Sequence, residues 1–270
     1  MVIGFIGAGV MARALGKGIV EGGVAEAKNL ICSAPTPEEG QPFLDLLPGS
    51  RWTANNEEVV LQSKLVILAI KPQVFPHAVP PLRKASAGTL FISLMAGISI
   101  AQISEALHPF ARVVRTMPNT PMQIGLGASV YAGGPNVTED DLVLAHLVLS
   151  SAGKAWPVEE EQINAVTALS GSGPAYVFHF IDALIRGGID QGLPEELSRD
   201  LALQTVLGSA QLAAMSTLSP LELAAQVKSP GGTTLAGCAV LEKHGAMNNL
   251  MTRCLAAAKK RAEELARGEG

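Results

Sequence analysis

The N-terminal stretch VIGFIGAGVMARAL, residues 2–15, constrains the fold more than any other part of the chain. A short apolar run, typical of a buried strand, leads directly into Gly7, Gly9 and Ala12, and helix-forming residues follow. Gly7 permits a tight turn, Gly9 lets a diphosphate approach the backbone, and Ala12 lets the helix pack closely on the sheet. This spacing predicts a strand, a turn and a helix that together bind a dinucleotide.

The first half of the chain alternates short apolar runs with helical segments. After a helix expected at about residues 10–21, strand patterns recur at NLICS, KLVILAI and TLFISLMAG, with VVRTMPN and ASVYAG as further strands. Strands that alternate with helices form parallel sheets through right-handed crossovers. We therefore predict an α/β fold with a parallel, doubly wound, Rossmann-like sheet in a dinucleotide-binding domain at residues 1–160.

Beyond Ala165 the strand patterns stop, and Ala- and Leu-rich helices separated by Gly and Pro take their place. We predict an all-α substrate and dimerisation domain at residues 161–270. Its helices are expected to begin near Gly171, Pro194, Pro220 and the PGGTT turn, with a last helix at about 247–266. Several of them are apolar around much of their circumference, more than a bundle of this size can hide. This pattern predicts an obligate homodimer formed through the helical domain.

Composition argues against several classes of protein. The net charge of −4 gives no general field for nucleic acid. The longest apolar runs are far shorter than the roughly 20 residues of a membrane span. Cys32, Cys238 and Cys254 are widely separated and show no CxxC spacing, so we expect neither disulfides nor a metal site. Because a strand pattern occupies the N-terminus and no leader pattern is seen, we expect a cytoplasmic protein.

The end of the second strand bears on which dinucleotide binds. NAD-binding folds usually place Asp or Glu there, about 20 residues after the glycines, to bind the ribose diol. This chain has Ser33 instead, so no carboxylate repels a 2′-phosphate. Asn56 is a candidate donor from the next crossover, whereas Arg13 is expected on a helix face that points elsewhere. The pattern favours NADPH, with NADH as the alternative.

The residue types in the chain also restrict the class of reaction that the protein can catalyse. Alcohol oxidation generally needs a positioned base or a metal, and the five histidines have no carboxylate partner at a suggestive spacing. Lys71, which follows the third strand, is either a cofactor contact or simply a strand terminus. Reduction of a C=N bond needs less proton machinery, because a protonated imine is already electrophilic. The sequence therefore favours imine reduction.

A second glycine-rich turn, KSPGGTTLAG at residues 228–237, describes a small anion site. Its glycines free the backbone to approach a ligand, and Ser229, Thr233 and Thr234 can donate hydrogen bonds at a helix start. An ordinary capped helix start, with Pro230 as a breaker, is the alternative interpretation. A substrate that is both a cyclic imine and a carboxylate would suit this turn.

Six strings in this chain occur in the order found in pyrroline-5-carboxylate reductases, and the chain resembles that family over almost its whole length. The strings are GFIGAGVMA, AIKP, MAG, MPNTP, LSGSGPAY and SPGGTT. The resemblance implies reduction of 1-pyrroline-5-carboxylate to L-proline with NAD(P)H, the last step of proline biosynthesis. It also implies interlocked dimers, commonly five in a ring to make a decamer.

The resemblance assigns roles to particular residues. It implies that the Thr234 hydroxyl, the catalytic group, hydrogen-bonds the substrate nitrogen, and that the carboxylate is held by Ser229, Gly232, Thr233 and Thr234. Cofactor contacts carry over to Gly7, Ala8, Gly9, Val10, Met11, Ala12, Ser33, Asn56, Ala69, Lys71, Pro72, Ala96 and Gly97. Glu160 corresponds to a glutamate near the substrate in some members, although its acidic run is typical of a solvated loop.

Two other functions stay open at this point. A β-hydroxyacid dehydrogenase would share the architecture, but that family has a catalytic lysine on the first long helix after the sheet, and AYVFHFIDALIRG has none. A catalytically silent NADPH-binding sensor or scaffold would be expected to have a broken substrate turn, whereas KSPGGTT is intact. We expect GSGPA, at residues 171–175, to start a helix and allow close packing.

Overall fold

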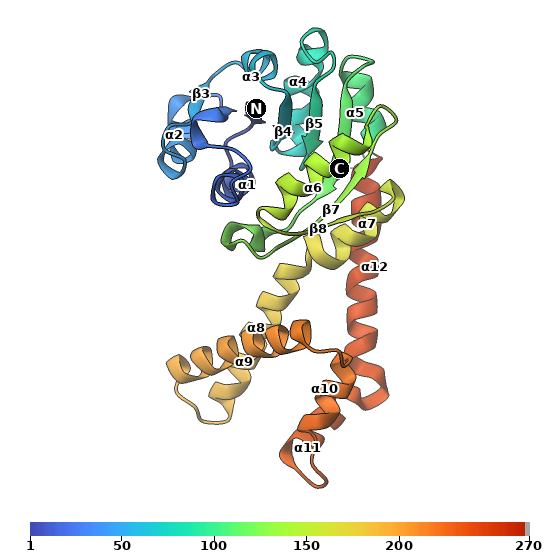
Figure 1. Ribbon diagram of the computed structural model, residues 1–270. Coiled ribbons are helices and arrows are strands. Elements are labelled where there is room, and N and C mark those ends of the chain that lie inside the picture. The colour runs from blue at the N-terminus through green and yellow to red at the C-terminus, as the bar shows by residue number, and fades with distance from the viewer. Residues whose placement is uncertain (268–270) are drawn as a thin grey trace. The chain divides into compact units, whose positions relative to one another are not determined.

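The structure, a computed structural model, describes residues 1–267 and divides into two compact units. The first unit comprises Met1–Ser172 together with the chain from Ala257 onward, and the second comprises Gly173–Ala256. The first contains all the strands, whereas the second is helical (Figure 1). The boundary predicted between residues 160 and 161 precedes this division, and Ile163 in the intervening segment is buried in the core of the first unit.

Eight strands form a single sheet in the first unit, in the order β3-β2-β1-β4-β5-β6-β7-β8. Their bounds are β1 Ile3–Ile6, β2 Leu30–Ser33, β3 Arg51–Thr53, β4 Leu65–Leu68, β5 Leu90–Ser93, β6 Arg112–Met117, β7 Gly127–Gly133 and β8 Gly153–Pro157. The strand order changes direction between β1 and β4, which is the switch point of a doubly wound sheet. The predicted fold class is confirmed.

Two features of the sheet correct the sequence-based expectation. β6 and β7 pair antiparallel, with Met117 opposite Val130, so β7 and β8 run against the first six strands. A parallel connection needs about a dozen or more residues, and residues 118–126 are too short a link. The sequence pattern also misses β3 and β8, because both are exposed edge strands that show no clear apolar alternation.

Helices cover both faces of the sheet. The helices of the first unit are α1 Val10–Glu21, α2 Pro37–Leu46, α3 Asn56–Gln62, α4 Phe75–Ala78, α5 Ile100–Ala106, α6 Glu139–Ser150 and α7 Ile163–Val166. Side chains alternate along each strand, so Phe5 points into the core with residues of α1, α2 and α6, while Ile6 points into the core with residues of α3 and α5. These two cores hold the strand ends, and the loops that follow them, in fixed positions.

The helices of the second unit begin close to the predicted residues. They are α8 Gly173–Asp190, α9 Glu195–Met215, α10 Pro220–Val227, α11 Thr233–Glu242 and α12 Ala246–Ala266, of which α12 continues into the first unit. Pro194 is the N-cap of α9, and Pro220 is the first residue of α10, as expected of a residue without an N–H group. α8 begins at Gly173 because Thr167–Gly171 forms a π-helix, η6, before it.

The second unit has almost no interior of its own. Among its residues only Ser198 and Ala202 are buried. Large apolar side chains are exposed on its helices, including Phe178, Phe180 and Leu201. Hydrophobic burial is the main stabilising term for a folded chain, so this unit needs another apolar surface to cover it.

Neither a membrane-spanning helix nor a metal-ligand cluster is found among the described residues. No helix among residues 1–267 combines the length and the apolar character needed to cross a membrane. In the same part of the chain, no three His, Cys, Asp or Glu side chains gather in an arrangement suited to a metal ion. The three cysteines are free thiols.

The buried thiol of Cys32 gives a test of the core. Desolvation raises its pKa from the ordinary 9.0 to about 12, so the reactive thiolate is scarce near neutral pH. We expect iodoacetamide at pH 8 to leave Cys32 unmodified in the native protein and to alkylate it in urea, as measured by peptide mass spectrometry. The thiol ionises at a lower pH in the unfolded chain than in the native protein. The free energy of unfolding should therefore fall as the pH rises above about 9. Rapid native alkylation of Cys32 would contradict the described packing.

Candidate functional site

The first glycine turn joins three strand ends. Gly7 has a φ of +98°, and a Cβ placed there would lie 2.6 Å from the carbonyl oxygen of Ala69, which follows β4. The Gly7 N–H donates to the carbonyl of Ser33, at the end of β2, over 3.0 Å. A side chain at this position would therefore clash with backbone, which explains the requirement for glycine.

Gly9 leaves the start of α1 open. It is the N-cap of α1, no side chain caps the helix, and a Cβ built on Gly9 would meet no atom within 4 Å. The first amides of a helix lack partners within the helix, and they attract anions together with the helix dipole. The backbone here fits a diphosphate, as the GxGxxA spacing predicts.

A cavity of about 400 Å³ lies at the carboxyl edge of β1, β4 and β5. It is lined by Gly9, Val10, Met11, Ala69, Ile70, Lys71, Pro72, Leu94, Met95 and Ala96. Most of these are predicted cofactor contacts, and the structure brings them together from three separate loops. The sequence analysis misses Ile70, Leu94 and Met95, although all three stand in or next to the AIKP and MAG strings that it uses.

Other predicted cofactor residues shape the loops instead of lining this cavity. Ala8 and Ala12 are buried behind the turn. Gly97 has a φ of +75°, and its Cβ position would lie 3.3 Å from the Cβ of Leu265 in α12. Close packing therefore requires a small side chain at Ala8 and Ala12 and no side chain at Gly97.

Ser33 and Asn56, which are expected to bear on cofactor choice, are hydrogen-bonded to each other, whereas the nearby Thr36 and Arg13 have other partners. Ser33 is buried, and its hydroxyl donates to Asn56 Oδ1 over 2.6 Å, so it holds Asn56 at the end of β2. The Thr36 hydroxyl accepts the N–H of Glu39 and caps α2. Arg13 does not point away as expected, because its guanidinium donates to the Ala8 carbonyl within the glycine turn over 3.2 Å.

The second glycine turn has a defined geometry. The N–H of Gly232 donates to the carbonyl of Ser229 over 2.9 Å, and Gly231 has a φ of +67°. Pro230 and Gly231 therefore occupy the two central positions of a type II turn. The turn ends at Gly232, which is the N-cap of α11 and has no side chain to satisfy the first amides of that helix.

The structure gathers the four predicted substrate residues around this helix start. Ser229 and Thr233 are exposed, whereas Gly232 and Thr234 are half-buried. Their hydroxyls and the unpaired amides of α11 form a compact group of hydrogen-bond donors, which is what a carboxylate requires. An ordinary helix start after Pro230 has the same backbone, but no side chain caps α11.

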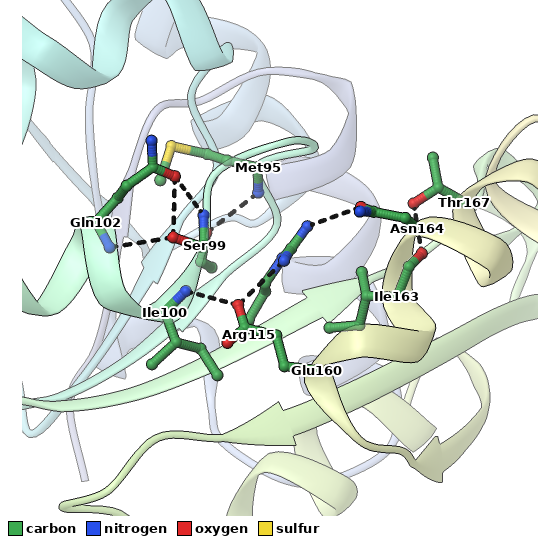
Figure 2. Close-up of polar contacts among 10 residues, drawn as sticks. Met95, Ser99, Ile100, Gln102, Arg115, Glu160, Ile163, Asn164 and Thr167 are labelled. Atoms are coloured by element: carbon green, nitrogen blue, oxygen red, sulfur yellow. Dashed lines mark hydrogen bonds and ion pairs between the residues drawn. The ribbon is translucent and has the colours of Figure 1, made fainter. Parts of the chain in front are cut away.

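A buried ion pair supports the loop after β5 (Figure 2). Arg115 on β6 has a side chain only 4% exposed, and its Nη1 lies 3.0 Å from Glu160 Oε1. The same oxygen accepts the N–H of Ile100, the first residue of α5, over 2.8 Å, and Arg115 Nη2 donates to Asn164 Oδ1 over 3.5 Å. The expectation that Glu160 stands in a solvated loop is therefore wrong, because its carboxylate ties α5 to β6.

The MPNTP and LSGSGPAY strings pack against each other. Asn119 Nδ2 donates to the carbonyl of Ser170 in the π-helix over 3.1 Å, while its Oδ1 accepts the N–H of Ala128 over 2.8 Å. A Cβ on Gly171 would lie 2.4 Å from Met117 Cε. The predicted close packing around Gly171 is confirmed.

Comparisons with known proteins agree with this geometry. A family model described as pyrroline-5-carboxylate reductase dimerisation matches residues 160–265, and one described as NADP oxidoreductase, coenzyme F420-dependent, matches residues 2–97. The chain is 40% identical to the pyrroline-5-carboxylate reductase of Pisum sativum over 97% of this chain and 95% of that protein. It belongs to the pyrroline-5-carboxylate reductase family.

Other members of this family extend the match. The Synechocystis pyrroline-5-carboxylate reductase is 37% identical over 97% of each chain. The solved structure of a pyrroline-5-carboxylate reductase from Coxiella burnetii has a TM-score of 0.91 at 34% identity, and that of the Plasmodium falciparum enzyme with NADP bound has a TM-score of 0.88 at 29% identity. Each of these two matches covers 98% of both chains.

The Arg115–Glu160 pair predicts a measurable stability difference. In an Arg115→Met variant the half-buried Glu160 carboxylate loses its partner, and breaking a buried pair typically costs about 3–5 kcal/mol. We expect the free energy of unfolding in urea, followed by circular dichroism, to fall by roughly that amount. The matched control is Lys28→Met, which removes an exposed pair with Glu26 in the first unit and should cost less than about 1 kcal/mol. Equal losses in the two variants would show that Arg115 is not a structural anchor.

Proposed function

We propose that this protein reduces 1-pyrroline-5-carboxylate to L-proline with a hydride from NAD(P)H, as the last step of proline biosynthesis. One observation carries the proposal: the uncapped start of α11, where Gly232 leaves the first amides open beside Ser229, Thr233 and Thr234. Family membership over nearly the whole chain supports the same reaction.

The residues of the turn would hold and orient the substrate. The amides at the start of α11 and the Ser229 and Thr233 hydroxyls bind the carboxylate, while the Thr234 hydroxyl hydrogen-bonds the ring nitrogen. A helix N-terminus contributes about 0.3–1 kcal/mol to binding an anion, and a hydrogen bond to a charged group about 1.5–3 kcal/mol. These contacts together outweigh any single proton transfer, so positioning is the main contribution of this turn.

The reaction needs no dedicated acid from the chain. Bound NADPH supplies a hydride. The imine carbon takes that hydride, and the electron pair of the C=N bond moves to a ring nitrogen that already carries a proton. The product is the secondary amine of proline, which Thr234 can still hydrogen-bond.

The first unit fits a dinucleotide, and we propose that NADPH is preferred over NADH. The open backbone at Gly9 and the uncapped α1 would hold the diphosphate. The end of β2 carries no carboxylate, and Ser33 holds Asn56 there. Lys71 and the other lining residues of the 400 Å³ cavity would contact the rest of the cofactor.

We propose that the second unit is the dimerisation domain and that five dimers assemble to a decamer. Its helices bury almost nothing by themselves, and a second copy offers a matching apolar surface. The family model for dimerisation matches residues 160–265, which include the whole second unit. A cytoplasmic location is part of the proposal and fits the three free cysteines.

Thr234 gives the first test of the reaction. The purified protein should oxidise NADPH in the presence of pyrroline-5-carboxylate and not with a simple 2-keto acid. Thr234→Ala should lower kcat about 10- to 100-fold, the value of one hydrogen bond to a charged group, without changing the Kd for NADPH. Thr234→Ser keeps the hydroxyl and should retain most of the activity.

Other results would redirect the proposal. An unchanged kcat in Thr234→Ala would remove that hydroxyl from the mechanism. NADPH binding by the wild-type protein without turnover of the imine would favour a cofactor sensor over an enzyme. The ratio of initial rates with NADPH and NADH tests the cofactor preference separately.

The oligomer gives a second test. Phe178 on α8 is 64% exposed, and Phe178→Glu would place a charge within the proposed dimer surface. We expect size-exclusion chromatography with light scattering to show loss of the wild-type assembly. The control Phe110→Glu changes a side chain that is 72% exposed in the first unit and should leave the assembly intact. The same mass for both variants would count against dimerisation through α8.

A further inference from the structure

One ion pair links the residue before the proposed substrate turn, residues 229–232, to the last residue of α11. Lys228 ends α10 as its C-cap and immediately precedes Ser229. Its Nζ lies 2.5 Å from Oε1 of Glu242, the last residue of α11. The pair therefore links the chain before the turn to the far end of the helix after it.

The pair acts on the helix face that carries Thr234. Thr234, Cys238 and Glu242 are spaced by four residues, so they lie on one face of α11. The contact between Lys228 and Glu242 shows that the end of this face is turned toward Lys228. Side chains on a helix tilt toward its N-terminus, so the Glu242 side chain points along this face of α11 in the direction of the turn.

This link has no substitute among the described residues. No other side-chain hydrogen bond or ion pair in residues 1–267 joins α10 or the turn to α11. The bond from Gly232 to Ser229 is internal to the turn and sets its shape, without fixing how α11 is rotated about its axis. The Lys228 side chain is 22% exposed, so it is held more firmly than most surface lysines.

We propose that Lys228 is a positioning residue, which acts through Glu242 to fix the rotation of α11 and so aims the Thr234 hydroxyl at the substrate nitrogen. This inference rests on the proposed function of the turn. It assigns Lys228 no contact with the substrate. If the ion pair only orients α11, its two charges can be exchanged without loss, whereas a lysine that bound the substrate carboxylate directly could not be replaced by glutamate.

A charge exchange tests the inference. Lys228→Glu and Glu242→Lys each place like charges together and should lower kcat and raise the KM for pyrroline-5-carboxylate, with kcat/KM about tenfold lower and the KM for NADPH unchanged. The double variant restores the pair in reverse and should return kcat/KM for the imine to within about threefold of wild type. The matched control exchanges Glu26 and Lys28, an exposed pair in the first unit with a 2.8 Å contact, and should change neither KM.

The other outcomes each overturn a specific statement. Single variants with wild-type kcat and KM values would show that the pair does not position the turn. A double variant no better than the singles, with activity kept in Lys228→Arg, would show that Lys228 binds the carboxylate directly. Circular dichroism and light scattering on every variant separate these results from loss of fold or assembly. A wild-type protein without imine turnover would instead overturn the proposed function, and this inference with it.

Discussion

The left-handed conformation of Gly7 is the constraint on which the first unit depends. Its missing Cβ lets β1 turn sharply while the loop after β4 lies directly against it, with the Ala69 carbonyl where a side chain would be. The same turn places Gly9 at the open start of α1, at the point where the strand order of the sheet changes direction. The cavity at this edge exists because the loops after β1, β4 and β5 can approach one another so closely.

Several helix starts are capped by a side chain. Thr36, Ser99, Thr138 and Ser219 cap α2, α5, α6 and α10 with their own hydroxyls, so the first amides of those helices are partly satisfied. At α1 and α11 the N-cap is glycine, and no side chain caps the first amides. The proposed reaction uses both of these glycine starts, one for the cofactor diphosphate and one for the substrate carboxylate.

The two units differ in where their apolar side chains are buried. The first has a core on each face of its sheet, and it can enclose even a guanidinium, because Glu160 and Asn164 accept hydrogen bonds from Nη1 and Nη2 of Arg115. The second buries almost none of its apolar side chains within one copy of the chain. The proposed dimer would supply that missing interior, which explains why the helices of the second unit are so apolar.

The sequence by itself determined the strands β1, β2 and β4–β7, the helix starts marked by Pro194 and Pro220, and the two glycine turns. These features depend on local chemistry: a φ above zero, a missing N–H or a run of apolar residues within a few positions. Tertiary structure alone decided the reversed direction of β7 and β8, the pairing of Arg115 with Glu160, and the contact of Lys228 with Glu242. Those contacts join residues far apart in the chain, and which charges meet depends on how the elements pack, which no local pattern records.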